Sequence, residues 1–374
     1  MKKTLFITND FPPKKGGVAN YLANLCNNLP KDKVVVLAPS FPCNEFYDCK
    51  INYKIYRFIE KKCCKVFPYW VKLIFEAKKI IKQEKVEQVF CGQPLPNGTI
   101  GLILNKFLKI PFVLSFHGMD ILVGQKKWRK RILLRKIIKK AKTIITNSNF
   151  TKNKVSQFYK IPKKISVIYP TSNLEFEENI NIQDIATRYN LNGKKVILSV
   201  GRLELRKGFD MMISAMPQIL KKVPNAIYLI IGTGKEKEYL SNLIDKLNLK
   251  NKVLILENIS NDNLKKFFLA CDVFSNPSRN IKGDVEGFGI VYLEANLAGK
   301  PVVAGKFGGE NEAVINSKTG FLVNSKNINE IEEKVTALLL DEKMAQKMGE
   351  LGKERALREF NIKKQAKLLE ELLA

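Results

Sequence analysis

Short apolar runs alternate with longer amphipathic segments along the chain. In the first half, the runs have the length and residue types of buried strands; they cover 5–8, 33–38, 86–91, 112–117, 143–146 and 164–169. Segments between them, such as 18–29 and 71–83, have the spacing of helices with one apolar face. Alternating strands and helices predict a parallel sheet covered on both faces.

The same pattern starts again at residue 194. A strand at 194–200 leads through Gly201 into a helix that begins at Phe209. Further strands are predicted at 226–231, 253–256, 273–275, 301–304 and 320–323, and helices at 328–340, 344–360 and 362–373. We therefore predict an α/β fold of two facing, doubly wound, Rossmann-like domains, 1–170 and 194–351. A linker at 171–193 joins them and contains a short helix at 185–189.

Several loops that follow predicted strands carry residues suited to an anionic or sugar ligand. Gly16 and Gly17 precede the helix at 18–29, a turn that presents backbone amides, although two glycines alone are a weak signal. His117 lies at the carboxyl end of the predicted strand 112–117, at the sheet edge where ligands bind. Arg202 and Lys207 lie five positions apart between a strand and a helix and place two cations near a diphosphate.

The stretch 284–295 is the most informative part of the sequence. Its pattern predicts a glycine-flanked loop that enters a helix near Phe288, with Glu286 before the helix and Glu294 inside it. Gly287 and the glycine at 289 leave the first helical amides accessible to an anion. Taken alone, this stretch also fits a helix that begins with glycine and carries a solvated glutamate. Together with Gly16-Gly17, Arg202/Lys207 and His117, it indicates a site for an anionic ligand that also carries sugar hydroxyls.

Composition excludes several other classes of protein. No run of about 18 apolar residues exists, and the first apolar run ends at Asn9, too early for a signal peptide, so we expect a cytoplasmic protein. Gly232-Thr233-Gly234 lacks the third glycine of a dinucleotide-binding fingerprint, which disfavours a nicotinamide oxidoreductase. One histidine and seven cysteines without paired spacing predict no metal site and no disulfide framework; the cysteines are at 26, 43, 49, 63, 64, 91 and 271.

Positive charge is concentrated in the first domain. Residues 1–170 hold 34 Lys and Arg against 9 Asp and Glu, whereas the rest of the chain is nearly balanced. Residues 126–142 contain ten Lys and Arg and no acid, and their apolar positions fall on one side of a helix. Such a helix packs on the sheet and offers its basic face, with Trp128 at its start, to an anionic partner such as an acidic membrane surface.

The motifs resemble the retaining nucleotide-sugar glycosyltransferases of family 4, with the glycosyltransferase B fold, along essentially the whole chain. Among these, the closest likeness is to phosphatidylinositol mannosyltransferases that use GDP-mannose. The resemblance rests on Glu-x7-Glu at 286 and 294 and on the stretches 8–13 with 16–17, 202–203, 206–208, 215–218, 284–295, and 308–309 with Glu312. Glu310-Asn311 departs from the small or proline residues usual in this loop. By resemblance, the last helix, at about 352–374, crosses back onto the first domain.

The resemblance also implies roles for individual residues. Gly16 and Gly17 let the first-domain loop approach the donor phosphates, and His117 contacts the transferred sugar. Arg202 and Lys207 neutralise the departing diphosphate in place of a metal or other cofactor.

The glutamate loop is expected to hold the rest of the donor. Glu286, with Gly287 and the amides of Phe288 and Gly289, holds the donor sugar, and Glu294 holds the ribose hydroxyls. The family retains the anomeric configuration, by front-face attack or through a covalent sugar.

We expect the donor to be a nucleotide sugar, GDP-mannose by resemblance, with a UDP-sugar as the alternative. The acceptor is expected to be an envelope glycan or glycolipid, such as lipopolysaccharide or a lipid-linked saccharide. The basic domain predicts peripheral association with the inner face of the cell membrane. A non-catalytic nucleic-acid-binding protein is the alternative from another class, but stacking aromatics are sparse among the cations, so no specific nucleic-acid partner is expected.

Overall fold

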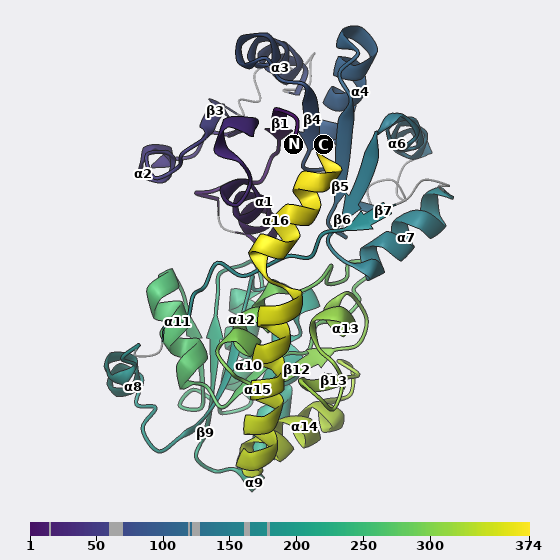
Figure 1. The fold of residues 1–374 in the computed structure, drawn as a ribbon. Coiled ribbons are helices and arrows are strands. Elements are labelled where there is room, and N and C mark those ends of the chain that lie inside the picture. Colours follow the sequence, from purple (N-terminus) through teal and green to yellow (C-terminus); the bar gives the residue numbers. More distant parts are fainter. Residues whose placement is uncertain (15, 60–69, 119, 122–127, 161–164, 178–179) are drawn as a thin grey trace. The chain divides into compact units, whose positions relative to one another are not determined.

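The computed structural model describes residues 1–14, 16–59, 70–118, 120–121, 128–160, 165–177 and 180–374. Among these residues the chain forms two compact units. The first unit contains residues 1–171 and 361–374, and the second contains 172–360 (Figure 1). Cys63 and Cys64, and residues 126–127 of the predicted basic helix, lie outside the described residues.

The first unit is built on a seven-stranded parallel sheet with the order β3-β2-β1-β4-β5-β6-β7. The strands are β1 (Thr4–Ile7), β2 (Val34–Pro39), β3 (Lys54–Phe58), β4 (Gln88–Cys91), β5 (Phe112–Phe116), β6 (Thr143–Thr146) and β7 (Ile165–Val167). The central strands are buried on both faces because helices cover both. The direction of winding reverses between β1 and β4, where an open sheet of this type places its ligand.

Helices α3, α4, α6 and α7 contribute to the core on one face of this sheet. They cover Trp70–Glu84, Asn97–Leu108, Trp128–Lys140 and Asn149–Tyr159. Ser148 caps α7 by accepting from the amide of Thr151. The other face packs on α1 (Gly17–Asn27) and on residues next to α2 (Asn44–Asp48), with the turn η1 (Lys31–Lys33) between α1 and β2.

The helix α16 (Ile362–Leu372) belongs to the first unit although it ends the sequence. It lies beside α1 (Figure 1). Leu369 and Leu373 are fully buried in the core that α1 forms with β1 and β2. The amide of Lys2 and Nε2 of Gln88 both donate to the carbonyl of Leu373. The predicted return of the last helix to the first domain is therefore confirmed. The returning segment begins at Asn361, because residues 352–360 lie in the second unit.

The second unit repeats the design with six parallel strands in the order β10-β9-β8-β11-β12-β13. They are β8 (Lys195–Val200), β9 (Ala226–Ile231), β10 (Val253–Leu256), β11 (Val273–Asn276), β12 (Val302–Gly305) and β13 (Gly320–Val323). Winding again reverses beside the first strand, between β8 and β11. The predicted pair of Rossmann-like domains is thus confirmed.

Helices α9 (Phe209–Lys222), α10 (Lys237–Lys246) and α14 (Ile328–Leu340) pack on one face of the second sheet. On the other face, α11 (Asn261–Ala270) and α12 (Ile290–Leu297) place Phe268 and Tyr292 against Phe274 of β11. Helix α8 (Gln183–Arg188) contacts α11, and α15 (Glu342–Glu359) contacts α12. The short helix α13 (Glu310–Ala313) follows β12.

Candidate active site

The loop after β8 carries two buried cations of the second unit. Arg206 and Lys207 lie in the turn η2 (Leu205–Lys207), and their side chains are 6% and 11% exposed. Gly208 ends this turn with φ 75°, and a Cβ there would lie 2.1 Å from the carbonyl oxygen of Pro277. Only glycine fits so close to another backbone. The packing of this loop against the segment after β11 therefore fixes the positions of both cations.

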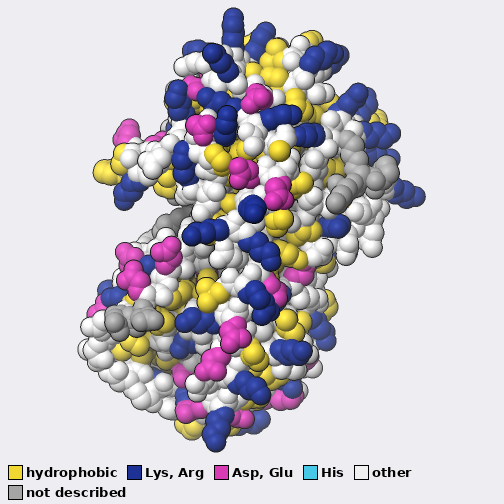
Figure 2. Space-filling view, in the orientation of Figure 1, with side chains coloured by type: hydrophobic (Ala, Val, Ile, Leu, Met, Phe, Trp, Pro, Cys, Tyr) yellow, Lys and Arg dark blue, Asp and Glu magenta, His cyan; other side chains and the backbone are white. Residues whose placement is uncertain are grey.

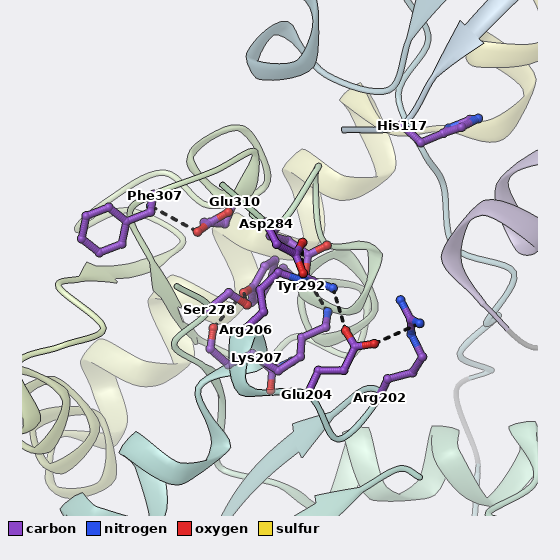
Figure 3. A network of polar contacts seen from close by, with 12 residues as sticks. His117, Arg202, Glu204, Arg206, Lys207, Ser278, Asp284, Tyr292, Phe307 and Glu310 are labelled. Carbon is purple, nitrogen blue, oxygen red and sulfur yellow. Dashed lines mark hydrogen bonds and ion pairs between the residues drawn. The ribbon is translucent and has the colours of Figure 1, made fainter. Parts of the chain in front are cut away.

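Both cations point at one carboxylate. Nη1 of Arg206 and Nζ of Lys207 donate to Oε2 of Glu286 at 2.7 and 2.6 Å. Arg206 also pairs with Asp284 at 3.2 Å and with Glu204 at 3.4 Å (Figure 3). Burial opposes ionisation of Glu286, but Lys207 and Arg206 outweigh it and lower the pKa of this carboxyl to about 2. Glu286 is therefore a fixed anion at neutral pH.

Arg202 has a different environment. Its side chain is 64% exposed and pairs with Glu204 at 3.0 Å (Figure 3). The structure thus brings Lys207 to Glu286, together with Arg206, while Arg202 reaches the rim of the cluster through Glu204. The roles of Arg202 and Lys207 toward a diphosphate stay predictions. The sequence does not predict that Arg206 is buried, because the residues next to it in the chain would be the same for an exposed arginine.

Helix α12 begins at Ile290, two residues after the predicted point, because Gly289 adopts φ 90° as its N-cap. A Cβ at Gly289 would lie 2.3 Å from the ring of Tyr292, so a side chain does not fit. The side chain of Phe288 is buried with its ring 5.3 Å from that of Phe360, so Phe288 can serve a ligand only through its backbone. Glu294 lies inside the helix and is buried; burial raises its pKa to about 7, and Lys207 opposes the rise.

A diglycine loop packs directly against the glutamate loop. The amide of Gly309 donates to the carbonyl of Glu286 at 2.8 Å. A Cβ on Gly308 would lie 2.4 Å from that carbonyl oxygen, and one on Gly309 would lie 2.0 Å from the carbonyl oxygen of Gly287. Both positions therefore need glycine for close approach of two backbones. This contact explains why the two motifs occur together in the sequence.

Glu310, the residue that departs from the family pattern, is 1% exposed. Its Oε1 accepts from the amide of Phe307 at 3.2 Å, while Oε2 is buried without a hydrogen-bond partner (Figure 3). Burial raises the pKa of Glu310 to about 8, and nearby Glu286 adds to the rise. The second unit therefore holds one fixed anion at Glu286 and a neutral acid beneath the diglycine loop at Glu310.

In the first unit, His117 follows β5 and is held by the backbone carbonyl of Gly92, the ring of Tyr21 and the carboxylate of Asp120. Its Nε2 lies 2.7 Å from the carbonyl oxygen of Gly92, which requires Nε2 to carry the proton in this contact. The ring also packs edge-on against Tyr21, with centroids 5.4 Å apart. Oδ2 of Asp120 accepts from the His117 amide at 2.9 Å, and burial raises the pKa of Asp120 although His117 opposes the rise. In the neutral ring, Nδ1 is therefore the acceptor.

Gly16 and Gly17 lie where β1 leads into α1, and both are exposed. A Cβ on Gly16 would meet no atom within 4 Å, so this position is open on its own unit. The first amides of α1 lie at this end of the helix, as the strand–loop–helix pattern predicts. Each unit therefore places its candidate residues in loops after its strands, at the ligand-binding edge of its own sheet.

Among the described residues, no group of three or more His, Cys, Asp and Glu side chains could hold a metal ion. The five described cysteines are free thiols: Cys26, Cys43, Cys49, Cys91 and Cys271. The cationic side chains that contact Glu286 are those of Arg206 and Lys207. They can stabilise an anionic leaving group without proton transfer.

Two Rossmann-like domains with the glutamate and diglycine loops define the class of protein as a glycosyltransferase of the B fold. A model of group 1 glycosyl transferases matches residues 181–355, and a model of glycosyltransferase family 4 matches residues 15–176. With the full-length relatives described next, these matches show that the chain belongs to the group 1, family 4 glycosyltransferases.

Relatives resemble the chain along nearly its whole length. It is 30% identical over 380 residues, 99% of this chain and 98% of the relative, to a GDP-mannose-dependent α-(1-6)-phosphatidylinositol monomannoside mannosyltransferase of Mycolicibacterium smegmatis. It is 29% identical over 94% of its length, and 92% of the relative's, to the mannosyltransferase of Corynebacterium glutamicum that acts on the monoacylated substrate. In fold it matches HepE of Anabaena, solved with UDP and glucose, with a TM-score of 0.85, 21% identity, and coverage of 100% and 99% of the two chains. The resemblance stated from the sequence is confirmed.

Proposed function

We propose that the protein transfers a mannosyl group from GDP-mannose to an envelope glycan or glycolipid acceptor, with retention of the anomeric configuration. Lipopolysaccharide and lipid-linked saccharides are acceptors of this kind. The observation that carries the proposal is the buried cluster of Arg206, Lys207 and Glu286 packed against the diglycine loop. The donor is supported by the relatives named as GDP-mannose-dependent mannosyltransferases.

In the transfer, the bond from the sugar C1 to the diphosphate oxygen breaks and a bond from C1 to the acceptor oxygen forms. The acceptor hydroxyl gives its proton to the leaving phosphate oxygen or to water, and negative charge develops on the nucleoside diphosphate as it departs. Lys207 uses one donor on Glu286 and retains others for a phosphate oxygen. Arg202, five positions before Lys207 and exposed, supplies a second cation. These two groups perform the neutralisation for which other transferases use a metal ion.

The remaining residues hold the donor. Glu286 and the amides of residues 288 and 289 bind hydroxyls of the sugar, and the buried Glu294 binds the ribose diol. In the first unit, His117 offers Nδ1 to a sugar hydroxyl because Gly92 occupies Nε2. Gly16 and Gly17 allow the donor phosphates to approach the start of α1.

The first unit brings the enzyme to its acceptor by electrostatic attraction. Lys and Arg side chains gather on the part of the surface formed by this unit (Figure 2). None of the described helices is both long and apolar enough to cross a membrane. We propose peripheral association with an anionic leaflet, where a glycolipid acceptor resides, and no specific nucleic-acid partner.

A UDP-sugar is the second candidate donor. HepE of Anabaena, which has the same fold, was solved with UDP and glucose. Because relatives are named as GDP-mannose-dependent and HepE was solved with UDP, the donor assay compares guanine and uracil nucleotide sugars.

Release of nucleoside diphosphate from a panel of nucleotide sugars, with and without host membranes, tests the proposal. We expect turnover of GDP-mannose that requires membranes and falls about 10²- to 10³-fold in Lys207→Ala. Lys222→Ala is the matched control, because Lys222 belongs to the same unit and pairs with Glu332 away from this cluster.

Product analysis by NMR then gives the anomeric configuration, and a chelator is expected to leave the rate unchanged. Turnover of a UDP-sugar alone would replace the donor and keep the reaction. No donor binding by calorimetry would overturn the proposed function.

A further inference from the structure

The most exposed large apolar side chains of the described residues are concentrated in the first unit. Phe75, Phe107 and Trp128 are 70%, 71% and 69% exposed, and Phe46 and Ile59 are 73% and 70% exposed. Exposing a large aromatic side chain to water is unfavourable unless a partner covers it. Three such residues therefore require an explanation if they lie on one surface.

Phe75, Phe107 and Trp128 come from three neighbouring helices. They belong to α3, α4 and α6, and α4 contacts both of the others. All three helices pack on the same face of the sheet through the same core. We call their outer side the helical face, formed by residues 70–84, 97–108 and 128–140. Phe46 lies on α2, next to the core of the opposite sheet face.

The helical spacing directs two of these aromatics outward. Leu73 and Ala77 of α3 are buried, and Phe75 lies on the opposite side of the helix. On α6, Leu134 and Ile138 face the sheet, whereas Trp128 and Ile132, one turn apart, are 69% and 45% exposed. Phe107 is exposed at the last turn of α4.

The helical face carries a large excess of positive charge. Its three helices contain twelve Lys and Arg against two Glu. One of these acids, Glu84, is buried and already pairs with Lys3 and Lys54. Figure 2 shows Lys and Arg side chains gathered in the upper part of the view, where Figure 1 labels α3 and α4. The surface therefore attracts an anionic partner.

Cations also lie beside the exposed rings. Nζ of Lys106 is 5.5 Å from the ring centroid of Phe107, and the guanidinium of Arg129 is 5.3 Å from that of Trp128. Aromatic rings next to long basic side chains suit the boundary of a bilayer, where rings enter the headgroup layer and cations reach lipid phosphates. An acidic leaflet is opposite in charge to the helical face.

We propose that the helical face is a membrane-docking surface, in which Phe75, Phe107 and Trp128 enter the interfacial layer of an anionic bilayer. The inference rests on the proposed function for the location of the acceptor, and it adds a defined surface and a hydrophobic component. Charge draws the protein to the leaflet, and the aromatics hold it there after salt screens the charge.

The test measures binding of the full chain to phosphatidylcholine vesicles with and without phosphatidylglycerol, at about 0.1 M and about 0.5 M salt. Binding is expected to require phosphatidylglycerol at low salt and to persist in part at high salt. Each change of Phe75, Phe107 or Trp128 to Ser is expected to weaken binding about five- to tenfold. Phe46→Ser, equally exposed but outside the helical face, is expected to bind as the unchanged protein does.

A spectroscopic test uses the two tryptophans of the chain. Trp70→Phe leaves Trp128 as the single tryptophan, and its emission is expected to shift to the blue on vesicles. The triple Ser variant is expected to keep full nucleoside-diphosphate release with a water-dispersed acceptor, because it leaves the donor residues untouched.

Several results would overturn the proposal. They are unchanged binding of the triple variant, an equal loss in Phe46→Ser, an unshifted Trp128 spectrum, or preference for RNA or another protein over vesicles at the same salt. A protein that docks as expected but turns over no donor would instead reject the proposed function and leave the docking surface standing.

Discussion

The candidate residues of the two units are held in opposite ways. In the second unit, a buried network of charges fixes the site: Glu286 receives Arg206 and Lys207 at 2.7 and 2.6 Å. In the first unit, His117 is held mainly by uncharged contacts, a backbone carbonyl and the ring of Tyr21. The second unit is also nearly balanced in charge, whereas the first is strongly basic at its surface.

The two units differ in whether their charged side chains are buried and paired or exposed to water. Buried, paired charges are fixed in place and can stabilise a charged leaving group without reorganisation. Exposed charges are hydrated and screened, so they direct association rather than chemistry. Under the proposed function, the second unit uses lysine and arginine in catalysis, and the first unit uses them to attract an anionic partner. The predictions below separate these uses, beginning with the largest effect.

Removal of Arg206 is expected to have the largest effect on stability. Arg206→Ala leaves the buried Glu286 with one cation and Asp284 with none of its described ion pairs, which lowers the free energy of unfolding by roughly 3–5 kcal/mol. The measurement is denaturant unfolding of the full chain.

Arg202→Ala is the matched control, since Arg202 is 64% exposed and pairs with the same Glu204. Its unfolding is expected to change by less than about 1 kcal/mol while nucleoside-diphosphate release falls. Equal destabilisation by both variants would remove the contrast between a buried network and an exposed cation.

The buried acids predict that the second unit loses stability as pH rises. The pKa values of Glu294 and Glu310 are raised to about 7 and about 8, so the folded chain binds more protons than the unfolded chain between about pH 4.5 and 8. The stability that these two protonated carboxyls contribute is fully present below their pKa in the unfolded chain. It is lost as pH increases through their pKa values in the folded chain. Thermal unfolding at about pH 5.5 and about pH 8.5 measures this slope.

Glu310→Gln keeps a neutral side chain at all pH values and is expected to recover on the order of 3 kcal/mol at the higher pH. Glu333→Gln, at an exposed position, is expected to leave the slope unchanged. An identical slope in Glu310→Gln and the unchanged chain would show that this carboxyl is not neutral in the folded state.

A smaller effect is expected in the first unit from Gly92→Ala. The added Cβ would lie 2.9 Å from Cβ of Thr8 and 3.0 Å from Cδ1 of Leu22, which costs about 1–3 kcal/mol and moves the carbonyl that holds His117. We expect kcat to fall about tenfold, with donor affinity unchanged by calorimetry. Ser115→Ala removes only the longer contact to His117, at 3.3 Å, and is expected to change kcat less.

Much of the fold is predictable because the strands are buried on both faces and stand out as apolar runs. The predicted bounds of β9, β10, β13 and α14 agree with the structure residue for residue. The edge strand β3 was missed because Lys54–Phe58 is polar and half-exposed, without a continuous apolar run. Helix α12 begins later than predicted because the positive φ of Gly289 cannot be read from residue types.

The candidate site is less predictable, since the sequence gives residue types and not their burial. The sequence predicts Arg202 and Lys207 as the two cations, whereas the structure places Arg206 beside Lys207 on Glu286, in a loop anchored by Gly208 against Pro277. The sequence shows Glu310 only as a departure from the small or proline residues usual in this loop, and does not predict its burial. Its burial depends on the close approach of two loops distant in sequence, a contact that a single sequence does not reveal.

The return of α16 to the first unit has a consequence for the order in which the chain is made. Residues 1–171 leave the ribosome before the second unit, and the helix that covers β1 and β2 follows about 190 residues later. At a synthesis rate of roughly 5–20 residues per second, the apolar surface that Leu369 and Leu373 cover stays exposed for about ten seconds or more. During synthesis, the first unit therefore begins folding before the second and completes its core after it.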